Sequence, residues 1–239
     1  GVKTFVTTPT VNGVLSMEGT ATVTVTTGVV TYGANATLQY NTATARIASS
    51  EEWITPFVAT GGVIIANTGT ITLNAAKVFN STAPLTINSG ATLAMSTFLL
   101  TLNGNFINNG GTTTGSGGVT ITGTVTQSIG AFTTTGTVTM SKTGGTVTFT
   151  GNVNGGALTI NGSGGTLNLG VSLTHTFTGM WTRTAGTLNG GSSTLKIGGS
   201  VSGTGGTFTA STGTVEWNAA GAQTIAGVIY NNLILSGSG

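Results

Sequence analysis

Apolar and polar residues alternate through much of the second half of the chain. Gly-Thr dipeptides begin successive segments of about 20 residues, at Gly145, Gly165, Gly186 and Gly206. In each segment an apolar residue and then a small polar residue follow the dipeptide. This two-residue period predicts a β-strand with one buried face. Because the triplet recurs once per segment, its copies are most simply stacked about 4.8 Å apart as a parallel ladder, and the chain is expected to coil as a β-solenoid.

The residues around the four dipeptides predict both a core and an outward surface. The apolar residues share one phase of the repeat and are expected to stack in the core; they are Val147, Leu167, Leu188 and Phe208. Their polar neighbours form a candidate outward ladder of Thr146, Thr148, Thr166, Asn168, Thr187, Asn189, Thr207 and Thr209. The ladder could reflect only β-propensity and contacts between turns, or serve for lateral packing against another filament. It also resembles the Thr-x-Thr arrays of some antifreeze solenoids, which makes ice binding an alternative function.

The repeat phase divides the chain into two regions. The repeat spacing predicts a solenoid domain over residues 61–239, with rungs of about 20–22 residues. Residues 1–60 do not follow this spacing. Within the first region, residues 44–57 predict a short helix or loop, with Glu51 and Glu52 in a solvated turn or helix start. Terminal units of a solenoid must cover an open core, so residues 1–60 are expected to form a cap or assembly region. The predicted fold class is therefore all-β, a parallel β-solenoid with an irregular N-terminal cap.

Charge is scarce in this sequence. Charged residues make up 4% of the 239 residues and leave a net charge of +2, whereas a typical domain carries about 25%. The six Lys and Arg lie far apart, so nucleic acid is not an expected partner. There is no Cys, which excludes disulfides and thiolate metal sites. No run of 18 apolar residues occurs, so no membrane span is expected.

Residues that could carry catalysis are few. The sequence has no Asp, and its one close pair of carboxylates, Glu51 and Glu52, would point to opposite faces of a strand. The single imidazole, His175, cannot bind zinc without Cys or Asp partners. A β-helix polysaccharide lyase would be an enzyme of this fold, but its acidic calcium cluster and basic catalytic residue have no candidates here. We therefore expect no enzyme, no metal and no cofactor.

Four aromatic side chains could stack on sugar rings, although packing within the turn is the commoner role of such residues. They are Tyr40, Trp181, Trp217 and Tyr230.

The last 27 residues resemble a known repeat unit. Their pattern runs from Gly213-Thr214-Val215-Glu216-Trp217-Asn218 through Gln223-Thr224-Ile225 to Tyr230-Asn231-Asn232-Leu233-Ile234-Leu235. It is similar to the unit of very large bacterial surface proteins, common in the Bacteroidota and their relatives, that are described as β-strand-repeat or adhesin-like. Those proteins are secreted and displayed at the cell surface. The resemblance implies an extracellular structural protein whose signal peptide has been removed, or a sugar-binding adhesin fragment with surface glycans as partners, and it brings no catalytic residues.

The terminal strands are candidates for self-assembly. The alternating strand of Leu233, Ile234 and Leu235 is followed by no capping sequence and is expected to pair with another strand. Residues 1–11, which include Val2, Phe5 and Val6, could supply that strand by addition to a neighbour's edge. Such a head-to-tail contact between identical chains does not close and predicts a fibre. The alternative is that the repeats continue past Gly239.

Overall fold

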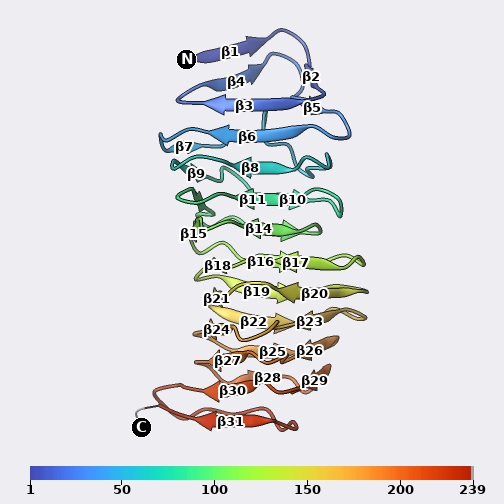
Figure 1. Ribbon diagram of the computed structural model, residues 1–239, viewed down its shortest axis with the longest axis vertical. Helices are drawn as coiled ribbons and strands as arrows, with labels where there is room; N and C mark the ends of the chain where they lie inside the picture. The colour runs from blue at the N-terminus through green and yellow to red at the C-terminus, as the bar shows by residue number, and fades with distance from the viewer. Residues whose placement is uncertain (238–239) are drawn as a thin grey trace. The chain divides into compact units, whose positions relative to one another are not determined.

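The computed structural model describes residues 1–237 and divides the chain into two compact units, Gly1–Gly117 and the residues from Gly118 onward. Within the described residues the regular structure consists of β-strands, with no helix. The strands of successive turns pair in parallel within each unit, as Figure 1 shows. Both units are therefore parallel β-solenoids, and the predicted fold class is confirmed.

The first unit contains fifteen strands. They are β1 (Val2–Phe5), β2 (Thr10–Val11), β3 (Val14–Glu18), β4 (Thr22–Val25), β5 (Thr31–Tyr32), β6 (Thr37–Asn41), β7 (Arg46–Ile47), β8 (Val63–Ile65), β9 (Thr70–Thr72), β10 (Lys77–Phe79), β11 (Leu85–Ile87), β12 (Thr92–Ala94), β13 (Leu100–Leu102), β14 (Phe106–Asn108) and β15 (Thr112–Thr114). Their longest sheet stacks β3, β6, β8, β11 and β14, and a second stacks β7, β9, β12 and β15. At the N-terminal end, β1 pairs with β4 and β2 with β5.

The described residues of the second unit contain sixteen strands. They are β16 (Val119–Ile121), β17 (Gln127–Ile129), β18 (Phe132–Thr133), β19 (Thr137–Met140), β20 (Thr146–Phe149), β21 (Val153–Gly155), β22 (Ala157–Ile160), β23 (Thr166–Asn168), β24 (Thr174–Phe177), β25 (Trp181–Arg183), β26 (Thr187–Asn189), β27 (Thr194–Ile197), β28 (Val201–Ser202), β29 (Thr207–Thr209), β30 (Thr214–Trp217) and β31 (Asn232–Leu235). Three parallel sheets result: β16, β19, β22, β25 and β28; β17, β20, β23, β26 and β29; and β18, β21, β24, β27, β30 and β31. A regular turn thus contributes one strand to each sheet.

Glycine in the Gly-Thr dipeptide forms the corner before a strand. Gly145, Gly186 and Gly206 have φ angles of 65°, 75° and 67°, in the left-handed region that favours glycine. A Cβ atom at Gly145 would also collide with the carbonyl oxygen of Thr124 in the neighbouring turn. The repeat therefore needs Gly at these corners for its backbone conformation and for the close approach of successive turns.

The predicted core column is present. Val147, Leu167, Leu188 and Phe208 are register partners on β20, β23, β26 and β29. The first three are at most 1% exposed. Phe208 is only half-buried, because β29 is the last strand of its sheet and no described strand covers it. The column confirms the prediction from the common phase of these four residues.

Residues 1–60 are more regular than their sequence indicates. Parallel pairing begins with β1 and β4 and continues with β3 and β6, so solenoid strands lie on both sides of residue 60. The two compact units meet in sequence after Gly117. The irregular part is the loop of residues 48–57, which contains turns and no helix, so that of the predicted short helix or loop the loop is the alternative present. This loop places the side chains of Trp53 and Phe57 in the core, both with 0% exposure.

Candidate functional site

The outward ladder has the predicted register. Thr146, Thr166, Thr187 and Thr207 are successive partners, and Thr148, Asn168, Asn189 and Thr209 form the neighbouring column. The two asparagines have a local role: their Oδ1 atoms accept hydrogen bonds from the N–H groups of Gly170 and Gly191, each at 2.9 Å. These Asx turns carry the chain into the next corner. Part of the ladder is thus explained by folding alone.

A second hydroxyl column lies on the sheet of β16, β19, β22, β25 and β28. Its residues are successive register partners, namely Thr120, Thr139, Thr159, Thr182 and Ser202. All five are half-buried, and Asn does not interrupt the column. This column was missed in the sequence because the apolar residue before each hydroxyl residue differs in type, from Val119 in one turn to Trp181 in another. The signal that could have found it is the apolar-hydroxyl-apolar triplet, such as Leu158-Thr159-Ile160.

The candidate sugar-stacking residues serve mainly as core. Tyr40, Trp181 and Trp217 are at most 1% exposed, and Tyr230 is half-buried. Trp181 packs against Trp217 with ring centroids 6.0 Å apart. The Tyr230 hydroxyl donates to the carbonyl oxygen of Ala226 at 2.5 Å. Since a stacking platform needs an open ring face, the first three do not provide one.

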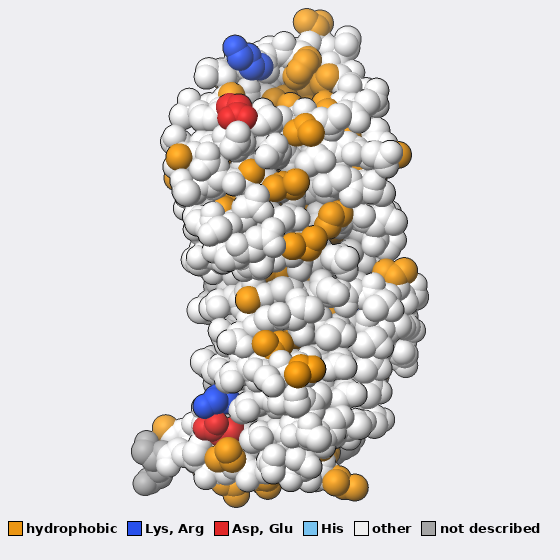
Figure 2. Space-filling view, viewed as in Figure 1, with side chains coloured by type: hydrophobic (Ala, Val, Ile, Leu, Met, Phe, Trp, Pro, Cys, Tyr) orange, Lys and Arg blue, Asp and Glu red, His pale blue; other side chains and the backbone are white. Residues whose placement is uncertain are grey.

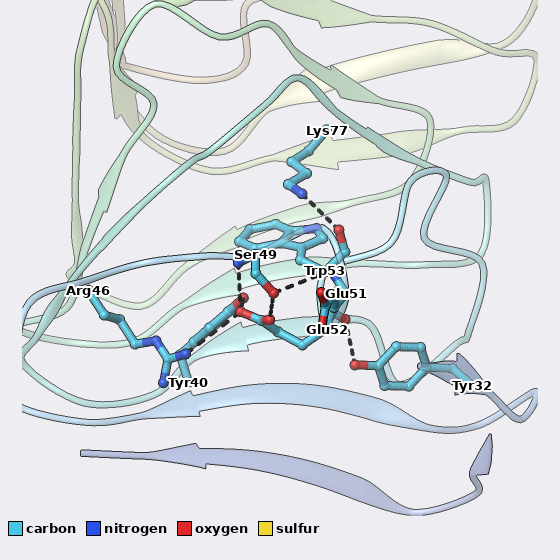
Figure 3. Close-up of polar contacts among 8 residues, drawn as sticks. All are labelled: Tyr32, Tyr40, Arg46, Ser49, Glu51, Glu52, Trp53 and Lys77. Carbon is cyan, nitrogen blue, oxygen red and sulfur yellow. Dashed lines mark hydrogen bonds and ion pairs between the residues drawn. The ribbon is translucent and has the colours of Figure 1, made fainter. Parts of the chain in front are cut away.

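The Glu51 and Glu52 prediction needs correction. Both residues lie in turns, but no helix begins there and Glu52 is 0% exposed rather than solvated. As Figure 3 shows, its carboxylate accepts from the Ser49 N–H at 2.7 Å, from the Ser49 hydroxyl and from the Tyr40 hydroxyl at 3.2 Å. The guanidinium of Arg46 lies 3.7 Å away. Burial is tolerated because these donors replace water around the charge.

Lys77 approaches the same loop from β10. Its Nζ donates to the carbonyl oxygen of Trp53 at 2.7 Å and lies 5.6 Å from the Trp53 ring centroid (Figure 3). Burial lowers the pKa of Lys77 to about 8, against the opposing effect of the Glu52 carboxylate. A lysine with a lowered pKa can act as a base, but this one is 0% exposed. Its contacts instead hold the loop of residues 48–57 to the next turn.

His175 is also an interior residue. The Val153 N–H donates to Nδ1 at 3.1 Å, and Nε2 lies 2.8 Å from the carbonyl oxygen of Leu169. A ring nitrogen that accepts an N–H cannot itself carry a proton, so these partners select the neutral ring with its hydrogen on Nε2. Burial lowers the pKa of His175, while the two backbone hydrogen bonds oppose that shift. The imidazole therefore cross-links two turns.

The C-terminal assembly strand lies at the edge of its sheet. Leu233 and Leu235 on β31 are register partners of Val215 and Trp217 on β30. Val215 and Trp217 are at most 3% exposed, whereas Leu233 is 42% and Leu235 66% exposed. Ile234, on the outward face, is 46% exposed. Within the described residues no strand pairs with the other edge of β31, which we call the open edge of β31.

A hollow of about 370 Å³ adjoins this strand. Trp217, Ile225 and Leu235 contribute apolar side chains to its lining, and the small residues at 219–221 leave it wide. The part of the chain from 218 to 237 has no charged residue. The hollow is thus lined by uncharged residues.

The N-terminal strand also lies at a sheet edge. On β1, Val2 is 64% and Phe5 38% exposed, and Val6 beyond it is 77% exposed. Lys3 and Phe5 are register partners of the buried Val23 and Val25 on β4, so they occupy the inward side. The side of β1 away from β4 pairs with no described strand; we call it the open edge of β1.

The described part of the chain contains no group of three or more His, Cys, Asp or Glu side chains placed to bind a metal ion. No helix in residues 1–237 is long and apolar enough to cross a membrane. The face in Figure 2 consists largely of uncharged atoms.

The chain was compared with known proteins at three levels. No protein-family model, curated protein or solved structure matches it.

Proposed function

We propose that this protein is a structural, adhesin-like component of the cell exterior that assembles end to end into a fibre. The carrying observation is the open edge of β31, where Leu233 and Leu235 occupy inward positions but remain 42% and 66% exposed. Their register partners on the preceding strand, Val215 and Trp217, are buried. An exposed apolar strand edge is a template for another strand, and proteins usually protect it with charge or a covering segment. Neither is present among residues 218–237.

The partner that suits this edge is the N-terminal strand of a second copy. β1 and the residue after it offer an open edge and exposed apolar side chains, including Val2 and Val6. A contact between two different surfaces of identical chains is heterologous and propagates. The low net charge of +2 leaves little repulsion between copies. In a longer polypeptide, further turns of the repeat would cover β31 in the same way.

A structural role agrees with the way the carboxylates are used. Glu52 is held in its buried cluster, and Glu51 accepts the Val25 N–H at 2.7 Å. Glu216 pairs with Lys196 at 2.9 Å. These groups hold strands and loops together and do not face one another across a cleft, which is the arrangement that two-carboxylate hydrolysis requires. The resemblance of residues 213–239 to surface-protein repeats supports an extracellular location.

Electron microscopy of the purified chain tests this proposal. Filaments are expected at high protein concentration, and Leu235→Lys should abolish them because it places a charge at an inward position of the open edge. Asn232→Lys is the matched control, since it adds the same charge to the outward face of the same strand. Monodisperse particles at every concentration, or filaments that tolerate Leu235→Lys, would refute assembly through β31.

The second hydroxyl column favours one further candidate, an ice-binding face. Its Thr120, Thr139, Thr159 and Thr182 are in register, about 4.8 Å apart from turn to turn. Thermal hysteresis of the purified protein tests it. Activity lost on Thr159→Lys would support this candidate, and freezing behaviour equal to that of buffer would exclude it.

A further inference from the structure

The backbone groups of β31 alternate in direction. In a parallel ladder, successive residues direct their N–H and C=O groups to opposite sides of the strand. The N–H groups of Asn232 and Ser236 donate to carbonyl oxygens of the β30 segment, those of Gly213 and Trp217. Leu233 and Leu235 therefore direct their backbone groups toward the open edge of β31.

The backbone of β1 has the opposite phase. The carbonyl oxygens of Gly1 and Phe5 accept hydrogen bonds from the N–H groups of Thr22 and Thr26 beside β4. By alternation, the backbone groups that face the open edge of β1 belong to Val2, Thr4 and Val6. A parallel pair needs each outward-directed residue of one strand to lie between two outward-directed residues of the other, and Leu233 fits between Val2 and Thr4.

The inward and outward alternation of the side chains agrees with this alignment of β1 and β31. Leu233 and Leu235 share the inward side with Val215 and Trp217, while Lys3 and Phe5 share it with Val23 and Val25. A shift by one residue would move the inward side chains of one strand to the outer face.

These two phases permit registers that differ by two residues, and among them we infer the one that pairs all four residues of β1 with all four of β31. The inference rests on the proposed end-to-end assembly. β1 of one copy lies parallel to β31 of the next, with Val2, Lys3, Thr4 and Phe5 opposite Asn232, Leu233, Ile234 and Leu235. Four backbone hydrogen bonds form: Leu233 N–H to the Val2 oxygen, Thr4 N–H to the Leu233 oxygen, Leu235 N–H to the Thr4 oxygen, and Val6 N–H to the Leu235 oxygen.

This register covers the most exposed inward side chains at both ends. Phe5 is placed against Leu235, beside the hollow that Trp217 lines, so that the ring covers a residue that is 66% exposed in the single chain. Lys3 is placed opposite Leu233. Its hydrocarbon stem can cover the leucine while the ammonium group stays in water, and an inward charge weakens edge pairing. The contact is therefore expected to be reversible.

Cysteine cross-linking distinguishes this register, because the natural chain has no Cys. Neighbouring parallel strands lie about 4.8 Å apart, within the Cα separation of a disulfide. Thr4→Cys with Ile234→Cys, and separately Val2→Cys with Asn232→Cys, should give a series of covalent oligomers on oxidation, since both pairs are outward and opposite. Thr4→Cys with Asn232→Cys is the mismatched control; its two-residue offset places the Cα atoms roughly 8 Å apart, too far for a disulfide.

The outcomes separate the two proposals. Covalent oligomers from both matched pairs, and monomers from the control, are the expected result. Filaments by microscopy without oligomers from the matched pairs, or with oligomers from the control pair, would overturn the register and leave the proposed assembly standing. Absence of filaments and of oligomers in every variant, including the natural chain, would overturn both.

Discussion

Leu167→Ala tests the stacked core of the second unit. Leu167 is 0% exposed and lies between Val147 and Leu188, which are at most 1% exposed. The substitution removes three buried carbon atoms, which corresponds to about 2.4 kcal/mol of lost transfer free energy. The backbone ladder holds the neighbouring strands about 4.8 Å away on either side, so the site cannot collapse and a cavity remains. Adding the cavity raises the expected loss in unfolding free energy to about 3–4 kcal/mol.

Urea titration followed by tryptophan fluorescence measures this loss. Trp181 and Trp217 report on the second unit, and an unchanged slope with urea would show that the denatured state is unaltered. Ile229→Ala is the control within the same unit, because it also removes three carbon atoms but from a side chain that is 87% exposed, and its expected loss is below about 1 kcal/mol. A loss below about 1 kcal/mol for Leu167→Ala would refute the stacked core.

Two further predictions concern buried ionisable groups. The pKa of His175 is lowered in the folded chain, so the unfolded chain binds the proton more readily; stability is complete above about pH 6.5 and declines as the pH falls below it. The melting temperature between pH 7.5 and 5 measures this decline, and an equal decline in His175→Gln would contradict its assignment to the imidazole. Glu52→Gln leaves the charge of Arg46 buried without its carboxylate and should lower the unfolding free energy by about 3–5 kcal/mol. Glu18→Gln, at an exposed site, is the control, and equal losses in the two variants would contradict the role of the buried pair.

The regular part of the fold was predictable because its signals are local. A side-chain period of two and a glycine at each corner determine which residue of a triplet faces inward, and Leu167 and Leu188 accordingly stack. The solenoid turns within the first 60 residues could not be recognised from the sequence because the strands there differ in length. For example, β5 and β7 have two residues each, whereas β6 has five.

The buried polar groups could not be predicted in the same way. Glu52 is buried because Tyr40, 12 residues before it, and Arg46 complete its hydrogen bonds and charge pairing. No local sequence pattern indicates which residues will provide these contacts. The terminal strands were partly predictable: the alternation of Leu233 to Leu235 indicated a strand, but the inward position of Lys3 follows only from its pairing with Val23.

Amide hydrogen exchange of Leu233 and Leu235 tests the end-to-end assembly most directly. In the single chain their N–H groups face the open edge of β31, so they should exchange rapidly at low protein concentration. The account predicts that both amides become protected at concentrations where filaments form, together with those of Thr4 and Val6. Filaments in which Leu233 and Leu235 still exchange as rapidly as in the single chain would contradict assembly through this edge.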